Sequence, residues 1–439
     1  MSGAALLECS PEQFTARLRE AGGRACLTWD HEQGRVRPSH PWLAEVATWL
    51  AGDARDFHRH EGVFMAVGPE TGALMTATVH TSVRGQAAGG LRQWPYATIQ
   101  ELLRDGLRLS LGMSRKNALA GLWWGGGKGI IARQSVEQAR DPGYRRALYR
   151  EYGAFTTSLR GVYITAEDVG TQPEDLAAVF ETTRFATCVP PSVGGSGNPS
   201  PATAKGVVCA IEAALDHCGR GSVAGKTIAM QGAGNVATYM IEELLGRGVG
   251  RVIAAEISAE RCELLRRRFA KAPVELRHTE IGDVSIFAEP CDVLAPNALG
   301  GVLDPTTIPM IQAPIVCGAA NNQLLDDRRD DKALAARGIV YVPDFVANRM
   351  GIVNCANEQY GQIGGPDKDP AIERHFSRDW DNAVFVVTKR ILAHAQTSGM
   401  TTAAAANELA DEAGRQPHPI WGHRGRAIID GLLADGWAG

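Results

Sequence analysis

Two lysines stand close together in the segment GMSRKNALAGLWWGGGKGII (112–131), at positions 116 and 128. Lys128 follows three glycines and precedes an apolar run, so we expect it in a glycine-rich loop from which water is partly excluded. Removing water from an ammonium group favours its neutral form and lowers its pKa. A lysine can act as a general base near neutral pH only after such a fall. Lys116 is a second cation that would lower the pKa of Lys128 further.

Asp168 follows a predicted strand, in the segment TAEDVG (165–170). A carboxylate in this place can pass a proton to or from an amine. The three residues therefore fit acid–base chemistry at an amine. Spacing alone leaves a plainer interpretation open, in which the lysines bind helix ends and Asp168 forms a surface ion pair.

The segment GAGNVA (232–237) lies between a predicted strand, KTIAMQG, and a predicted helix, NVATYMIEELLGRG. The first glycine permits a tight turn, the second lets the backbone approach a pyrophosphate, and Ala237 is small enough for a helix to pack on a sheet. The start of the helix offers unpaired N–H groups to phosphates. The predicted dinucleotide contacts here are Gly232, Gly234, Asn235 and Val236. A strand–helix turn with chance glycines is the alternative.

Glu256 ends the next predicted strand, RVIAAEIS (251–258). An acid at this place accepts hydrogen bonds from the adenosine ribose and repels a 2′-phosphate, which favours NAD over NADP. Arg261 is close enough in sequence to weaken that preference, and a surface role for Glu256 stays open.

The elements around these residues predict an α/β fold with two domains. Residues 65–83 alternate around a Gly-Pro-Glu-Thr-Gly turn and predict a hairpin, and residues 98–121 have helical spacing. A stretch rich in Pro, Gly and Ser (189–206) marks the boundary, and Thr203 is placed to cap the next helix. Strands then alternate with helices, as in a parallel, doubly wound sheet of the Rossmann type. We expect domains over 1–198 and 199–370, and a helical C-terminal segment (371–439) that packs back on the body.

The composition argues against several classes of partner and site. There are 45 basic and 49 acidic residues with no basic arm, which argues against nucleic acid or an anionic membrane as a partner. The start of the chain does not resemble a signal peptide, and no apolar run is long enough to span a membrane. Nine scattered cysteines without C-x-x-C spacing predict reduced thiols, no zinc site and a cytoplasmic location. His418 and His423 are expected to be structural rather than metal ligands.

Several blocks together resemble the glutamate/leucine/phenylalanine/valine dehydrogenase family, most closely its branched-chain and aromatic members. They are GGLRQWPY (89–96), MSRKNALAGLWWGGGKGII (113–131), YITAEDVGT (163–171), SGNPSPATAKGV (196–207), VAGKTIAMQGAGNVA (223–237), CDVLAPNALGGVL (291–303), CGAANNQL (317–324) and VPDFVANRMGIVNCANEQYG (342–361). They occur in the order in which the family has them. The resemblance implies oxidation of an L-amino acid by NAD and water to a 2-oxo acid, ammonium and NADH. It also implies a first domain for substrate, catalysis and oligomerisation, an NAD domain, a site in the cleft between them, and a homo-oligomer.

The resemblance implies a role for each matching residue. Lys116 would bind the substrate carboxylate, Lys128 would activate the water that attacks the imino acid, and Asp168 would transfer protons at the nitrogen. Thr203 and Asn322 would hold the nicotinamide carboxamide, and Asn348 begins a segment that lies near the nicotinamide in relatives.

The side-chain pocket implied by the resemblance is apolar. Glutamate-specific members carry a lysine where this chain has Ala88, and the other pocket positions are Gly89, Met113, Ile352 and Cys355. A substrate carboxylate would be left unpaired among these residues. We therefore expect an apolar substrate, and one methylene is too weak a signal to separate leucine, valine, phenylalanine and tryptophan.

Three residues depart from the family pattern. Trp123 and Trp124 replace smaller residues before the glycines, and Arg349 stands where small residues are usual. The tryptophans would reshape the pocket or belong to the core, and Arg349 puts the substrate range in doubt. Two alternatives stay open: the same chemistry on an unusual amino acid from a specialised pathway, and a non-catalytic, NAD-binding regulatory protein.

Overall fold

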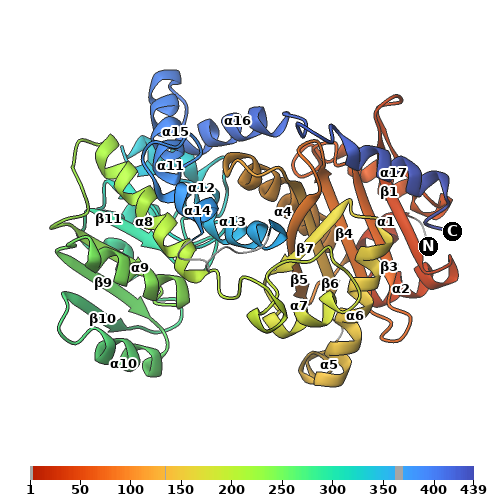
Figure 1. Cartoon of the computed structure of the whole chain (residues 1–439), viewed down its shortest axis with the longest axis horizontal. Helices are drawn as coiled ribbons and strands as arrows, with labels where there is room; N and C mark the ends of the chain where they lie inside the picture. The colour runs from red at the N-terminus through yellow and green to blue at the C-terminus, as the bar shows by residue number, and fades with distance from the viewer. Residues whose placement is uncertain (1–2, 134, 361–368) are drawn as a thin grey trace. The chain divides into compact units, whose positions relative to one another are not determined.

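The computed structural model describes residues 3–133, 135–360 and 369–439, and it divides into two compact units (Figure 1). Unit 1 comprises residues 1–197 and 411–439, and unit 2 comprises residues 198–410. The C-terminal helical segment therefore contributes to both units. The fold class is the predicted α/β class.

Unit 1 is built on a seven-stranded sheet in the order β2-β1-β3-β4-β6-β5-β7. Its strands are β1 (Arg24–Asp30), β2 (Arg35–Pro38), β3 (Gly62–Val67), β4 (Leu74–Thr81), β5 (Ala87–Trp94), β6 (Gly125–Ala132) and β7 (Tyr163–Glu167). β3 and β4 form the predicted antiparallel hairpin. β5 lies between β6 and β7 and runs parallel to both, so these three strands end at one edge of the sheet.

Helices cover both faces of this sheet. The helices of unit 1 are α1 (Gly3–Glu8), α2 (Pro11–Glu20), α3 (Ala44–Gly52), α4 (Ile99–Leu119), α5 (Val136–Arg140), α6 (Pro142–Ser158), α7 (Pro173–Phe180) and α17 (Arg424–Ala434), with short 3-10 turns at Pro41–Leu43 and Pro191–Val193. One apolar core joins α1 to α4 with the sheet, and the other joins α6, α7 and α17 with it. α17 thus brings the end of the chain into the core of unit 1.

The glycine-rich segment around Lys128 is a strand and not the predicted loop. All eight residues of β6 are buried between β4 and β5. A Cβ atom at Gly127 would lie 2.6 Å from the Tyr163 ring, and one at Gly129 would lie 2.1 Å from the Tyr152 hydroxyl. The glycines are therefore present because they allow close packing around a central strand, and not because the chain turns there.

Unit 2 is built on a six-stranded sheet in the order β10-β9-β8-β11-β12-β13, and each strand pair is parallel. Its strands are β8 (Thr227–Gln231), β9 (Arg251–Glu256), β10 (Val274–His278), β11 (Val293–Pro296), β12 (Ile315–Val316) and β13 (Val340–Tyr341). Numbered from β8, this is the 3-2-1-4-5-6 order of dinucleotide-binding sheets, and it confirms the predicted doubly wound fold.

Helices surround the sheet of unit 2. They are α8 (Ser200–His217), α9 (Asn235–Gly246), α10 (Ala259–Arg268), α11 (Asp330–Ala336), α12 (Asp344–Ala347), α13 (Met350–Asn357), α14 (Pro370–Glu373) and α15 (Val384–Ser398), with 3-10 turns at Ser285–Ala288, Ile308–Met310, Glu358–Tyr360 and Arg374–Phe376. α16 (Thr402–Gly414) crosses the boundary between the units. The predicted cap at Thr203 is wrong, because α8 begins at Ser200 and Thr203 lies inside its first turn.

The thiols agree with the prediction at seven positions. Cys9, Cys26, Cys209, Cys218, Cys262, Cys291 and Cys317 are free thiols. Cys188 and Cys355 are disulfide-bonded, so the prediction of reduced thiols fails for these two residues. Among the described helices, none combines the length and apolar character needed to cross a bilayer.

Candidate active site

Lys128 and Asp168 form a close ion pair in unit 1. Lys128 projects from β6, and its Nζ donates a hydrogen bond of 2.5 Å to Oδ2 of Asp168, the first residue after β7. The Lys128 side chain is 5% exposed and that of Asp168 is 20% exposed. The pair is thus nearly closed to solvent on the lysine side and open on the aspartate side.

Arg92 joins this pair from the strand between them. Its Nε donates to Oδ2 of Asp168 at 3.0 Å, and its Nη1 donates to Oδ2 of Asp105 on α4, also at 3.0 Å. The Tyr96 hydroxyl donates to the same Asp105 oxygen. Five side chains therefore form one continuous set of charged hydrogen bonds.

The pKa values of both residues are lowered, for different reasons. Burial lowers the pKa of Lys128, the Asp168 carboxylate opposes this, and the positive charge of Arg92 adds to the lowering. Burial alone would raise the pKa of Asp168, but Lys128 and Arg92 outweigh it and bring the value to about 2. The direction predicted for Lys128 is confirmed. Arg92 is a second cation that lowers its pKa, and the same effect of Lys116, in the last turn of α4, stays a prediction.

The loop that carries Asp168 is held from several sides. The Asp168 N–H donates to Thr171 Oγ1 at 2.9 Å, and that hydroxyl donates back to the Asp168 carbonyl at 2.7 Å. A Cβ atom at Gly90 would lie 2.7 Å from Cβ of Asp168, so only glycine fits there beside the aspartate. These contacts leave little freedom in the direction of the carboxylate.

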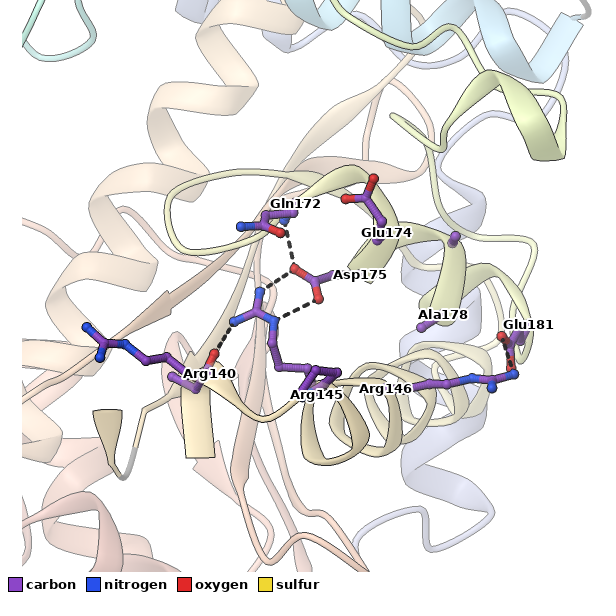
Figure 2. A pocket seen from close by; sticks show the side chains of 11 residues that line it. Arg140, Arg145, Arg146, Gln172, Glu174, Asp175, Ala178 and Glu181 are labelled. Atoms are coloured by element: carbon purple, nitrogen blue, oxygen red, sulfur yellow. Dashed lines mark hydrogen bonds and ion pairs between the residues drawn. The ribbon is translucent and has the colours of Figure 1, made fainter. Parts of the chain in front are cut away.

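A groove of about 520 Å³ lies behind this loop, between α5, α6 and α7 (Figure 2). Figure 2 shows Arg145 directed at Asp175 and Arg146 directed at Glu181. Arg145 also donates to the carbonyl of Gly170 at 3.3 Å. Arg145 and Arg146 thus pair with acidic residues of the groove, and Arg145 supports the Asp168 loop.

The predicted pocket residues fall into two sets. Ala88 and Gly89 lie on β5 and are buried, and Met113 lies on α4. A Cβ atom at Gly89 would lie 3.2 Å from Cγ of Met113, so these two residues meet. Ile352 and Cys355 lie in unit 2, one turn apart on α13.

The predicted dinucleotide loop lies where the strand order of unit 2 reverses, between β8 and β11. Gly232 has a φ of +92°, and a Cβ atom there would lie 2.6 Å from Cβ of Ala298, which follows β11. Gly234 is the N-cap of α9, and Asn235 and Val236 are its first residues. In such sheets a dinucleotide binds at this point, with its phosphates at the helix N-terminus.

Glu256 and Arg261 both contact this loop. The Glu256 carboxylate accepts hydrogen bonds from the N–H groups of Ala233 and Ser258, each at 3.0 Å. Arg261 donates to the Ala233 carbonyl at 2.5 Å and to Oδ1 of Asn235 at 3.2 Å. A guanidinium is therefore fixed close to the carboxylate that would contact the ribose.

The other predicted cofactor residues lie near the ends of neighbouring elements. Thr203 Oγ1 donates to the Pro199 carbonyl at 2.9 Å, and the Asn322 N–H donates to Asp344 at 3.0 Å, with a φ of +52° at Asn322. Asn348 Nδ2 donates to the Ala319 carbonyl at 3.0 Å.

Five buried side-chain amide atoms in unit 2 lack a hydrogen-bond partner among the residues that the structure describes: one each on Gln323, Asn297 and Asn348, and two on Asn354. Two of the five belong to residues already considered or next to a strand end: Oδ1 of Asn348, and Nδ2 of Asn297, which directly follows β11. Such atoms are costly to bury unless a ligand or water satisfies them. Both therefore fit a ligand with amide and hydroxyl groups, such as a nicotinamide dinucleotide. Asn297 escaped the sequence interpretation, although it stands in the block CDVLAPNALGGVL at the end of a predicted strand.

The adjacent residues Trp123 and Trp124 lie in different surroundings. Trp123 is 37% exposed, with the Arg84 guanidinium 4.4 Å from its ring centroid and the His418 ring 5.6 Å away. It therefore packs against the C-terminal segment, whereas Trp124 is buried.

The two C-terminal histidines bind protein groups. His423 Nε2 lies 2.9 Å from Oε1 of the buried Glu61. His418 Nδ1 accepts hydrogen bonds from the N–H groups of Ile420 and Trp421. Across the described part of the chain, no group of three or more His, Cys, Asp or Glu residues could hold a metal ion.

Arg349 is fully buried in unit 2, and its Nη2 donates to the carbonyl of Asn382. One contact of this arginine is thus with a backbone carbonyl of its own unit.

Comparison with protein families gives two matches. Residues 72–185 match a family model described as the Glu/Leu/Phe/Val dehydrogenase dimerisation domain. Residues 194–413 match the model described as Glutamate/Leucine/Phenylalanine/Valine dehydrogenase.

Individual proteins match over most of their length. Leucine dehydrogenase of Geobacillus stearothermophilus is 36% identical over 354 residues, which cover 80% of this chain and 90% of that protein. Valine dehydrogenase of Streptomyces virginiae is 37% identical over 356 residues, 80% of this chain and 93% of that protein. The crystal structure of L-tryptophan dehydrogenase from Nostoc punctiforme superposes with a TM-score of 0.66 at 31% identity, and covers 81% of this chain and 96% of that one.

Proposed function

Because the chain belongs to the glutamate/leucine/phenylalanine/valine dehydrogenase family, we propose that Lys128 and Asp168 carry the NAD-dependent oxidative deamination of an apolar L-amino acid. The chain is an amino acid dehydrogenase, an oxidoreductase that acts on a CH–NH2 group. The reaction converts the amino acid and water to a 2-oxo acid and ammonium, and it is reversible. The buried Lys128, paired with Asp168, is the observation that carries the assignment.

The two residues divide the proton transfers. Neutral Lys128 would accept a proton from the water that attacks the imino carbon, and its lowered pKa supports this role. Asp168 uses Oδ2 for both of its cations, and its Oδ1 makes no hydrogen bond to the residues that the structure describes. Oδ1 would exchange protons with the substrate nitrogen. Lys116 would bind the substrate carboxylate.

A nicotinamide dinucleotide would accept the hydride from the substrate α-carbon. Gly232, Gly234, Asn235 and Val236 would hold its phosphates, and Thr203, Asn322 and Asn348 would hold its carboxamide. The unpartnered Oδ1 of Asn348 supports that contact, since a carboxamide offers two N–H donors. The Glu256 carboxylate favours NAD over NADP, because it would repel a 2′-phosphate.

The substrate side chain would meet an apolar surface. Ala88 supplies no cation for a side-chain carboxylate, and Gly89 meets Met113 beside it. Ile352 and Cys355 are further proposed contacts of the substrate side chain. Relatives described as leucine, valine and tryptophan dehydrogenases support an apolar substrate.

The units would divide the work. Residues 1–198 would bind substrate and form a homo-oligomer, which the match to a dimerisation domain supports. Residues 199–370 would bind NAD, and residues 371–439 would pack back on the body. The cytoplasmic location stays a prediction, which cell fractionation would test.

The direct test follows NADH formation by absorbance across the L-amino acids, with NAD and NADP in parallel. We expect turnover with at least one apolar amino acid and with NAD. Lys128→Ala should abolish turnover and leave NAD binding intact, whereas Lys271→Ala, at an exposed lysine, should change neither. Full activity of Lys128→Ala would disprove the assigned base. NAD binding without turnover on any amino acid would favour a regulatory protein instead.

A further inference from the structure

Arg92 lies at the centre of the hydrogen-bonded set of charged side chains, and its own function is not explained by the proposed reaction. It binds Asp168 through Nε and Asp105 through Nη1, and Tyr96 donates to Asp105 from the other side. The Arg92 side chain is 20% exposed and that of Asp105 is 26% exposed. Charges in such partly buried positions lose part of their hydration, and a network in which each hydrogen bond is made holds its members in one geometry.

The geometry makes Arg92 the link between the helix α4 and the reacting groups. Asp168 has no other cation besides Lys128 and Arg92 among its described hydrogen-bond partners. When Lys128 loses its charge, Arg92 remains to hold the same carboxylate oxygen. Asp105 in turn holds Arg92, and the planar guanidinium can bind both carboxylates at once.

We propose that Arg92 is a positioning residue of this site: it fixes the Asp168 carboxylate beside Lys128 and places a second positive charge there, while Asp105 and Tyr96 fix Arg92. This inference rests on the proposed function, since it explains how the chain prepares the lysine base. Arg92 itself need not touch the substrate.

The charges have opposite effects on Lys128. The positive charge of Arg92 disfavours a second cation nearby and lowers the pKa of Lys128, whereas the negative charge of Asp105 raises it. Further groups of the described chain that act on Lys128, Arg92 or Asp168 include Tyr96, Tyr163 and Glu167. Burial raises the pKa values of Tyr96 and Tyr163, so both stay neutral over the working range.

The test measures kcat/KM against pH, in the direction of deamination, for three variants. Arg92→Gln should move the rise in kcat/KM to higher pH, because the ammonium of Lys128 loses a repelling charge. Asp105→Asn should move the rise to lower pH. Arg92→Lys should keep the position of the rise close to that of the unchanged protein, with a rate about tenfold lower, because an ammonium lacks the planar fork that spans two carboxylates.

A second measurement does not depend on turnover. The rate at which acetic anhydride acetylates Lys128, followed by mass spectrometry against pH, reports the neutral fraction of its amine. The same opposite shifts are expected in Arg92→Gln and Asp105→Asn. Arg247→Gln, which breaks the ion pair with Glu212 in unit 2, is the matched control and should shift nothing.

The outcomes are distinct. Opposite shifts in both measurements support the positioning role. Unmoved profiles, or shifts of Arg92→Gln and Asp105→Asn in the same direction, overturn it. An arginine with a structural role alone would lower the rate when replaced but would not shift the pH dependence in the direction that its charge requires. If no amino acid is turned over, the proposed function fails, and the acetylation profiles still decide the role of Arg92.

Discussion

Lys128 and Asp168 come from different strands, forty positions apart in the chain, and meet through a hydrogen bond of 2.5 Å. β5 lies between their strands, and its Leu91 pairs with Gly129, next to Lys128, on one side and with Glu167, next to Asp168, on the other. The contact therefore depends on strand order, and a lysine that would be solvated on a surface becomes buried beside a single shared carboxylate oxygen.

The first prediction concerns pH. Lys128 accepts a proton only when neutral, so deamination should slow as pH falls through its pKa. Because burial and Arg92 lower that pKa, the fall should occur below the range of an ordinary lysine. Asp168, with a pKa of about 2, stays ionised throughout. A profile of kcat/KM checks this, and a midpoint at the ordinary lysine value would contradict it.

The second prediction concerns Asp168→Asn. The amide cannot exchange protons with the substrate nitrogen, so kcat should fall by about a hundredfold or more. The pKa of Lys128 should also fall, because the carboxylate that raises it is lost. Steady-state kinetics with calorimetric NAD binding separates the effects. Unchanged kcat would remove Asp168 from the chemistry, and loss of NAD binding would indicate misfolding.

The sequence predicted local features more reliably than the contacts between distant segments. The hairpin over 65–83 and the βα alternation after 225 follow from apolar periodicity, and both are present. Lys128 was placed in a loop because three glycines resemble a turn. The glycines are needed because of tertiary packing: Tyr152 and Tyr163 occupy the space that side chains on β6 would need.

Arg92 shows the same limit within the site. It stands in the quoted block GGLRQWPY, but its partners Asp105 and Asp168 lie on two other elements. Sequence spacing favoured Lys116 as the second cation because it was closer in the chain. The sequence shows that Arg92 stands in a predicted strand. That this strand pairs with the strand of Lys128 becomes clear only from the strand order of the folded sheet.

The third prediction concerns the cofactor. Glu256→Ser removes the carboxylate that repels a 2′-phosphate, and Arg261 stays in place to attract one. The preference for NAD over NADP should therefore shrink by about tenfold or more. Kinetics with both cofactors measures the ratio.

The double variant Glu256→Ser/Arg261→Ala is the control for this shift. It should lose the gain with NADP, because the guanidinium is gone. An unchanged ratio in the single variant would show that Glu256 serves only to hold the N–H groups of Ala233 and Ser258.

The last prediction concerns the glycines of β6. A methyl group at Gly129 would lie 2.1 Å from the Tyr152 hydroxyl and 2.6 Å from that of Tyr163, both buried. Gly129→Ala should therefore lower the free energy of unfolding by about 1–3 kcal/mol, the usual cost of overpacking. Gly112, in α4, has open space around it, so Gly112→Ala should raise stability by about 0.5–1 kcal/mol. Urea unfolding at one fixed protein concentration compares the two variants. Equal stability of both would mean that the tyrosines move aside, and the glycines of β6 would then have no packing role.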